Sequence, residues 1–141
     1  MYSIIGSATE QQHLSQFRDW LEEEWGTVDP FEGPVEGFAV PSPILAVDEH
    51  VLLGGLGFTS FSKPGSAEIG VWINTLLVAP MYRNTGIGSK LVQAAEAEAI
   101  RIKALELFVC TGIPNLYLNL KWTIVGNTND SMVLRRILTN G

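Results

Sequence analysis

The feature that most constrains the fold is an apolar, β-branched stretch, Glu68–Val78, followed at once by a glycine-containing loop and a helical pattern. A continuous apolar run of this kind is typical of a strand buried on both faces, because a strand with one wet face alternates apolar and polar residues. Ala79-Pro80 ends the strand, since proline cannot donate to a strand ladder. The sequence therefore predicts a mixed α/β fold in which one sheet is flanked by helices.

Periodicity places the remaining elements around this strand. A helix capped by Thr9 is predicted up to Trp25, and a second helix over 89–103 turns Leu91, Ala95, Ala99 and Ile102 inward and Glu96 outward. Further strands are expected at 44–47, 51–61, 105–110, 122–125 and 132–138, with a short helix at 114–120 and a loop or short broken helices at 27–43. We expect one domain over residues 1–141, with a mixed central sheet of about six to seven strands.

Charge limits the partners of the chain. Its 9 Lys and Arg against 15 Asp and Glu give a net charge of −6, which argues against nucleic acid or an anionic membrane as partner. Residues 1–80 carry −9 and residues 81–141 carry +3, so two sub-sites of opposite sign are expected. A lone cysteine, the absence of a signal-peptide pattern and the lack of a long apolar run predict a cytoplasmic protein.

The loop between the apolar strand and the second helix is the strongest candidate for a ligand-binding site. A helix N-terminus presents backbone N–H groups without intrahelical partners and the positive end of the helix dipole. Gly86 and Gly88 let this backbone close around a phosphate, and Arg83 adds a cation at the mouth. The loop is therefore interpreted as an anion site suited to pyrophosphate, although glycines that serve only packing are the simpler alternative.

Two other nucleotide motifs fit less well. A Walker A loop needs Gly-Lys-Ser/Thr, and the order here is Gly88-Ser89-Lys90. A dinucleotide fingerprint needs a third small residue where Leu91 stands, and an acid after the second strand, whereas Glu106 falls near the start of its strand. Both alternatives fail on these details.

Two blocks of the sequence resemble the GNAT-type N-acetyltransferase superfamily. Residues 78–88 match its V-x-P strand end followed by Arg/Gln-x-x-Gly-x-Gly/Ala, and residues 116–122 are similar to its L-Y-x-x-L-G-F/W segment. The tail from 125 to 138 resembles the last strand pair of that family. The resemblance implies a single-domain GNAT-like fold and an enzyme that transfers an acetyl group from acetyl-CoA to an amine.

The resemblance also implies how the acyl donor is held. The main chain at the end of the long strand would hydrogen-bond the pantetheine arm, and the loop would bind the pyrophosphate. By position these residues are Leu76, Leu77, Val78, Arg83, Asn84, Thr85, Gly86, Ile87, Gly88 and Ser89. A strand N–H would polarise the thioester oxygen during direct attack by the amine in a ternary complex.

The catalytic residues are implied in the same way. Tyr117 stands where the family's tyrosine protonates the departing thiolate, a role that suits a phenol. The family often carries an acid where Asn74 stands, and asparagine cannot be a base. Glu68 at the strand start, His50 in the hairpin turn and water remain as candidates for the base, of which we take Glu68. No His, Cys or carboxylate pattern has ligand spacing, so no metal is predicted.

Lys121 departs from the family pattern, and several other residues lie near the expected site. Lys121 replaces a glycine that tolerates positive φ, and a lysine in the left-handed region costs about 1 kcal/mol, so the turn is expected to be reshaped. Cys110 ends a strand near the expected position of the acyl group and is interpreted as a buried, inert thiol. Trp20, Trp25 and Trp72 fall in segments that form the acceptor cleft in relatives, although core packing is the simpler interpretation.

Three functions remain open at this stage. The first is the N-acetyltransferase, with a cationic small molecule or peptide as acceptor, because the acidic half of the chain supplies most of the acceptor side. The second is a non-catalytic acyl-CoA-binding module, which the missing acid at Asn74 favours. The third is a protein-interaction domain with purely structural glycines. Separately from these three functions, a homodimer is kept as an alternative for the oligomeric state.

Overall fold

The computed structural model describes residues 2–6, 11–25, 38–128 and 130–138. Its strands are β1 (Ser3–Gly6), β2 (Ile44–Asp48), β3 (Val51–Ser62), β4 (Ile69–Val78), β5 (Glu106–Thr111), β6 (Thr123–Thr128) and β7 (Ser131–Ile137). Its helices are α1 (Gln11–Trp25), α2 (Ile87–Arg101) and α3 (Pro114–Asn119), with a 3₁₀ turn, η2, at Pro80–Tyr82. No described helix is long and apolar enough to cross a membrane.

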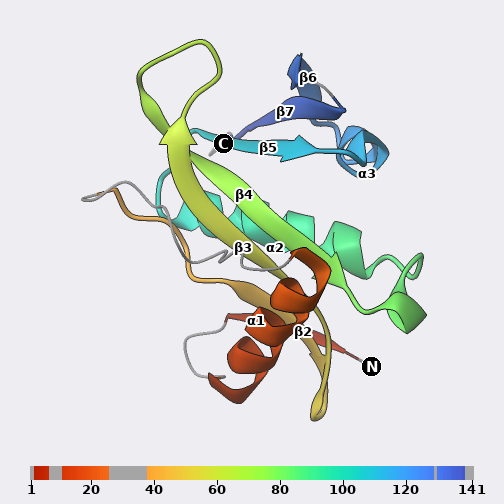
Figure 1. Ribbon diagram of the computed structural model, residues 1–141. Coiled ribbons are helices and arrows are strands. Elements are labelled where there is room, and N and C mark those ends of the chain that lie inside the picture. The colour runs from red at the N-terminus through yellow and green to blue at the C-terminus, as the bar shows by residue number, and fades with distance from the viewer. Residues whose placement is uncertain (1, 7–10, 26–37, 129, 139–141) are drawn as a thin grey trace.

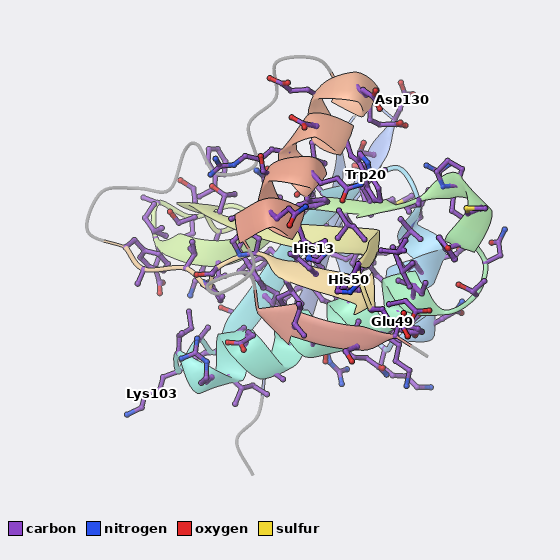
Figure 2. The ribbon with its side chains drawn as sticks, turned by 90° about the horizontal axis from the view of Figure 1, so that it is seen from below. His13, Trp20, Glu49, His50, Lys103 and Asp130 are labelled. Carbon is purple, nitrogen blue, oxygen red and sulfur yellow. The ribbon has the colours of Figure 1, made fainter. Side chains whose placement is uncertain are left out.

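All seven strands form one sheet in the order β1-β2-β3-β4-β5-β7-β6. Only the β4–β5 pair is parallel, and α2 is the crossover between these two strands, as a parallel connection requires. α1 covers one face of the sheet and α2 the other (Figures 1 and 2). The predicted mixed sheet flanked by helices is therefore confirmed.

Two apolar clusters fill the spaces between these layers. The larger lies on the α2 side and includes Leu91, Ala95, Val71 and Ile73. The smaller lies under α1, where Phe17 and Leu21 pack on β2 and β3. A side chain at Gly55 would place its Cβ 2.8 Å from the Phe17 ring, so this glycine allows α1 to approach the sheet closely.

β4 is central, as predicted, but its environment changes along its length. Its pairing with β5 covers only Val71, Trp72 and Ile73, whereas its pairing with β3 continues to Val78. Beyond Ile73 the two parallel strands diverge (Figure 1). Asn74, which is exposed, is the extra residue of a β-bulge, because Ile73 pairs with Phe58 and Thr75 with Gly57. The expectation of burial on both faces therefore holds only for the first half of the strand.

Some boundaries differ from the sequence prediction. α2 begins at Ile87, two residues earlier than expected, because Gly86 supplies the left-handed residue at which the helix starts. β1 was not predicted, since four residues carry too short a pattern, and it adds the first strand of the sheet beside β2. The predicted Thr9 cap and most of the predicted 27–43 loop lie outside the described residues.

Candidate functional site

The loop after β4 builds the N-terminus of α2 from backbone groups. Gly86 has φ +88°, a conformation that other L-residues rarely adopt, and a Cβ there would meet open space. No side chain caps α2, and its first turn has no acidic residue. The first N–H groups of the helix are therefore free of side-chain partners and suited to an anion.

Short contacts fix the path of this loop. The Arg83 Nε donates to the carbonyl oxygen of Val78 at 2.9 Å, which ties the loop to the end of β4. The Thr85 hydroxyl donates to the carbonyl oxygen of Tyr82. Arg83 thus orders the loop through one N–H, while its planar guanidinium has further donors for a phosphate.

A pocket of ≈ 720 Å³ runs along this loop and the end of β4. It is lined by eight of the predicted donor residues, Leu76, Leu77, Val78, Arg83, Asn84, Gly86, Gly88 and Ser89. Thr85 and Ile87 do not line it, and Ile87 faces the core with 3% exposure. Tertiary packing brings four other residues to this pocket, Glu24, Tyr82, Ile113 and Leu116. Tyr82 and Leu116 lie within the two sequence blocks but were not predicted to bind the donor.

A second pocket of ≈ 360 Å³ lies where β4 and β5 diverge. β4 contributes Ile73 through Leu76, β5 and the loop after it contribute Val109 through Ile113, and α3 contributes Tyr117. Leu76 and Ile113 line both pockets. The two pockets therefore adjoin, and one elongated ligand can extend from the α2 N-terminus to Tyr117.

Tyr117 is held at this second pocket in a buried position. It is 2% exposed, and its ring packs edge-on against Trp122 with the centroids 5.1 Å apart. Burial raises the pKa of the Tyr117 phenol well above its usual value of 10, because desolvation disfavours the phenolate. The phenol is therefore protonated throughout the range in which enzymes work.

The turn after α3 is fixed by a charged network that the sequence analysis missed. Glu96 of α2 accepts hydrogen bonds from the Trp122 indole at 3.1 Å and from the Arg136 Nε at 3.2 Å. Arg136 also donates to the carbonyl oxygen of Lys121 at 3.1 Å. Glu96 was predicted to face outward, and three-dimensional packing instead makes it the anchor of this turn.

Lys121 adopts a left-handed backbone conformation, in which a glycine would be less strained. Its φ is +75°, so the turn is strained rather than reshaped. The N–H of Trp122 donates to the carbonyl oxygen of Tyr117 at 3.0 Å. This turn therefore connects the Glu96 network directly to the residue that faces the second pocket.

Cys110 differs from its prediction. The thiol was expected to be buried, but Cys110 is exposed and lines the second pocket. Its Sγ lies 4.0 Å from the Thr128 hydroxyl. The reason is strand alternation: Val109 packs on the α2 side, so Cys110 points to the opposite face, which α1 does not cover at this end.

The structure does not bring Glu68 to the two pockets. Its carboxylate pairs with Lys63 at 2.9 Å, and Lys63 also pairs with Glu106 at 3.0 Å. The hydrogen bonds from Glu68 and Glu106 raise the pKa of Lys63. These side chains line a third, smaller pocket, and the strand rise puts residue 68 about 20 Å from Asn74.

Nor do the described tryptophans and histidines line the two pockets. His50 lies in the hairpin turn, where its carbonyl oxygen is 3.2 Å from the His13 Nε2 at α1 (Figure 2). Trp72 donates to the carbonyl oxygen of Phe61 at 3.2 Å, and Trp20 packs against the cluster under α1. The Trp25 side chain lies outside the described part. Within the described ranges no three His, Cys, Asp or Glu residues cluster as metal ligands.

Comparison with known proteins decides the family. The model of the acetyltransferase (GNAT) family matches residues 9–118, which is most of the chain. The chain belongs to the GNAT acetyltransferase family. The resemblance predicted from the two sequence blocks is thereby confirmed, together with the enzyme class, an acetyl-CoA-dependent acyltransferase. No curated protein matches this acetyltransferase significantly.

Solved structures show the same fold at low sequence identity. A GNAT-family acetyltransferase from Staphylococcus aureus is 14% identical, with a TM-score of 0.68 over 99% of this chain and 100% of its own. An aminoglycoside 6′-acetyltransferase of type Ii is 21% identical, with a TM-score of 0.70 over 100% and 99%. YncA of Salmonella typhimurium, assigned as an acetyltransferase and solved with its cofactor acetyl-CoA, is 12% identical, with a TM-score of 0.70 over 100% and 96%.

Proposed function

We propose that this acetyltransferase acetylates an amine by direct attack on acetyl-CoA in a ternary complex. The observation that carries the proposal is the continuity of the two pockets at Leu76 and Ile113. The first pocket would take the pyrophosphate and pantetheine of the donor, and the second would take the thioester and the attacking nitrogen. The α2 N-terminus, at one end of the joined pockets, suits the pyrophosphate, and Tyr117, at the other end, suits the thioester.

The α2 N-terminus fits a pyrophosphate. Its uncapped N–H groups and the +88° φ of Gly86 form a concave backbone surface, and Arg83 stands at the mouth of the pocket. Backbone N–H groups and a guanidinium are strong donors to phosphate oxygens, and the helix dipole adds to the attraction. We therefore assign Arg83, Asn84 and residues 86–89 to the pyrophosphate, with the Ile87 contribution coming from its backbone alone.

The free edge of β4 fits the pantetheine arm and the thioester. Beyond Ile73 its backbone pairs with β3 on one side, and pairing with β5 has ended on the other. Backbone groups on that side need partners, since an unpaired buried N–H costs free energy. The amides of pantetheine supply such partners along Leu76, Leu77 and Val78, and a strand N–H can stabilise charge on the thioester oxygen.

Tyr117 fits the general acid. Its phenol is buried in the second pocket, and its raised pKa keeps it protonated. In the reaction the amine nitrogen forms a bond to the acetyl carbon, the carbon–sulfur bond breaks, and the departing thiolate takes the Tyr117 proton. The phenolate is then reprotonated by solvent after the products leave.

The proton on the amine needs a separate route. Asn74 cannot accept it, and among the described residues the single carboxylate that lines either pocket is Glu24, at the donor end. We therefore propose that the amine reacts in its neutral form and that the excess proton passes to water. For an alkyl amine with a pKa of about 10, the rate then rises nearly tenfold per pH unit from neutral pH.

The acceptor class follows from charge. The first 80 residues carry −9, and this part of the chain includes α1 and the β4 edge that lines the second pocket. A cationic small molecule or peptide is favoured by that field. The aminoglycoside acetyltransferase of the same fold acts, as its name states, on an acceptor rich in amines.

The experiment measures CoA release from acetyl-CoA with a panel of spermidine, kanamycin and a peptide with a free N-terminus. We expect one of these amines to accelerate release in the wild-type protein, with a rate that rises between neutral and mildly alkaline pH. Tyr117→Phe should lower kcat about a hundredfold while the acetyl-CoA Kd stays the same. Tyr82→Phe is the matched control and should keep the wild-type kcat, because Tyr82 lines only the donor pocket.

Two results would overturn the proposal. Tight binding of acetyl-CoA without amine-stimulated release of CoA would favour the non-catalytic acyl-CoA-binding alternative for this chain. A Tyr117→Phe variant as active as wild type would remove the tyrosine from the reaction.

A further inference from the structure

Thr75 is a buried polar residue with an unmet hydrogen bond. It is 6% exposed, and its Oγ1 is a buried side-chain atom that has no partner in the described structure. A hydroxyl removed from water without a partner lowers the stability of the folded state, because its hydration is lost and nothing replaces it. Such groups are rare in native structures, and a catalytic role or a bound water or ion is among the reasons for which they are retained.

The position of Thr75 shows where that partner would lie. Thr75 lines the second pocket together with Tyr117 and Cys110. It directly follows the bulged Asn74, and bulges of this kind re-aim the side chains next to them. Leu77 packs under α1, so strand alternation places Thr75 on the same face of the sheet, opposite to α2.

Two other threonine hydroxyls in the segments around the two pockets do not share this state. The Thr111 hydroxyl accepts a hydrogen bond from the N–H of Ile113 at 3.0 Å, and the Thr85 hydroxyl is bonded to the Tyr82 carbonyl oxygen. Because no described hydrogen bond holds the Thr75 hydroxyl, a rotation of about 120° about Cα–Cβ moves the hydroxyl to the position of the methyl group and the methyl group to that of the Cβ hydrogen. A ligand can therefore draw the hydroxyl toward the pocket without breaking an existing bond.

We propose that the Thr75 hydroxyl accepts a hydrogen bond from the attacking amine and directs its lone pair at the thioester carbon. This inference rests on the proposed function. The unpaired β4 edge already offers backbone N–H groups to the thioester oxygen, which needs donors. The amine instead needs an acceptor for its N–H, and a hydroxyl oxygen has two lone pairs.

Thr75 neither gains nor loses a proton in this scheme. The nitrogen–carbon bond forms, the carbon–sulfur bond breaks, Tyr117 protonates the thiolate, and the excess amine proton leaves to water. Thr75 touches the attacking nitrogen and is therefore assigned as a catalytic residue that acts by orientation. Its absence should slow attack by the amine without weakening the binding of acetyl-CoA.

The test compares Thr75→Val with Thr75→Ser. Valine keeps the shape and removes the hydroxyl, so we expect kcat/KM for the fastest of the three panel amines to fall tenfold to about a hundredfold. The acetyl-CoA Kd and the slow hydrolysis of acetyl-CoA without amine should not change. Serine should restore most of the activity, because it returns the hydroxyl.

Stability provides a second readout that separates this role from a structural one. Thr75→Val removes a buried hydroxyl that has no partner among the described residues, so the urea midpoint should stay the same or rise. A hydroxyl with a structural role would give a lower midpoint. Thr59→Val is the matched control, because Thr59 is a half-buried threonine on β3 that lines neither pocket. It should leave the kcat/KM with the amine, the rate of hydrolysis and the acetyl-CoA Kd unchanged.

The outcomes distinguish this inference from the function on which it rests. If wild-type protein binds acetyl-CoA and acetylates an amine while Thr75→Val is equally active, the inference alone is wrong. If Thr75→Val slows hydrolysis and amine transfer by the same factor, the hydroxyl serves the thioester and the inference is again wrong. If wild-type protein does not bind acetyl-CoA or acetylates none of the amines, the proposed function fails as well.

Discussion

The donor loop, residues 79–89, and the pocket between β4 and β5 adjoin each other but are built in different ways. The donor loop is made of backbone groups from one continuous segment, ordered by the positive φ of Gly86 and by the Arg83 contact with Val78. The second pocket is made of side chains from β4, β5 and α3. Under the proposed function, the first arrangement recognises the nucleotide end of acetyl-CoA, and the second faces the acceptor amine.

This difference teaches where variation is tolerated. The loop depends on a few residues with one role each: Gly86 supplies the positive φ, and Arg83 ties the loop to Val78 and provides a positive charge. The shape of the second pocket is set by the positions at which β4, β5 and α3 meet. Polar side chains in it, such as those of Asn74 and Thr75, can therefore be substituted without altering the fold. The low identities to structures with the same fold, 12–21%, agree with this division.

The largest expected effect tests the loop. Gly86→Val puts a β-branched residue at φ +88°, which costs about 1–2 kcal/mol. It also misaligns the N–H groups of α2, so we expect the acetyl-CoA Kd to rise about a hundredfold, as the loss of two hydrogen bonds to a charged group would cause. Isothermal titration calorimetry measures this change.

Gly65→Val is the matched control for that experiment. Gly65 has φ +69° and open space around it, in a turn that lines neither of the two adjoining pockets. The two variants should lose similar stability, whereas only Gly86→Val should lose affinity. An equal loss of affinity in both would mean that the loop geometry has no special role in binding.

A smaller expected effect, on the alkylation rate of Cys110, tests which part of acetyl-CoA occupies the second pocket. Cys110 is the single cysteine, it is exposed, and it lines the second pocket. Acetyl-CoA at ten times its Kd should slow alkylation of Cys110 by a maleimide about tenfold, because only a tenth of the protein is then unliganded. The rate is followed by mass spectrometry of the adduct.

Adenosine 3′,5′-bisphosphate is the control ligand for this labelling experiment. It carries the nucleotide end of CoA without the pantetheine arm, so it can occupy the donor end but not the second pocket. It should leave the alkylation rate unchanged. Equal protection by both ligands would argue against the assignment of the thioester to the pocket between β4 and β5.

The smallest effect concerns the turn that holds Tyr117. Lys121→Gly relieves the strain of φ +75° but increases the entropy of the unfolded chain, so we expect a net gain of about 0.5–1 kcal/mol in unfolding free energy. Urea denaturation measures this gain. Acetyl-transfer activity should not change, because the backbone path to Tyr117 is kept.

Lys103→Gly provides the comparison for this turn. Lys103 has φ +67° and follows α2, away from the Glu96 network. Both variants should gain similar stability. A loss of stability in Lys121→Gly alone would show that the lysine side chain, rather than the backbone conformation, supports the turn.

Most of the fold could be predicted from the sequence because its signals are local. The apolar run of β4, the proline that ends it and the apolar stripe of α2 each depend on neighbours in the chain. β1 was missed because a strand of four residues has no reliable pattern of its own. The burial of the second half of β4 was overestimated, since the point at which pairing with β5 ends is not a property of β4 alone.

By itself, the sequence predicted the position of the donor loop, because two glycines, an arginine and a predicted helix start lie within seven residues of one another. Only the tertiary structure decided which groups lie in and around the second pocket. It exposed Cys110, moved Glu96 inward to hold the turn after α3, separated Glu68 from Tyr117, and left the Thr75 hydroxyl without a partner. The physical reason is that backbone conformation is set by adjacent residues, whereas solvation and hydrogen bonding in a pocket are set by segments that meet only after folding.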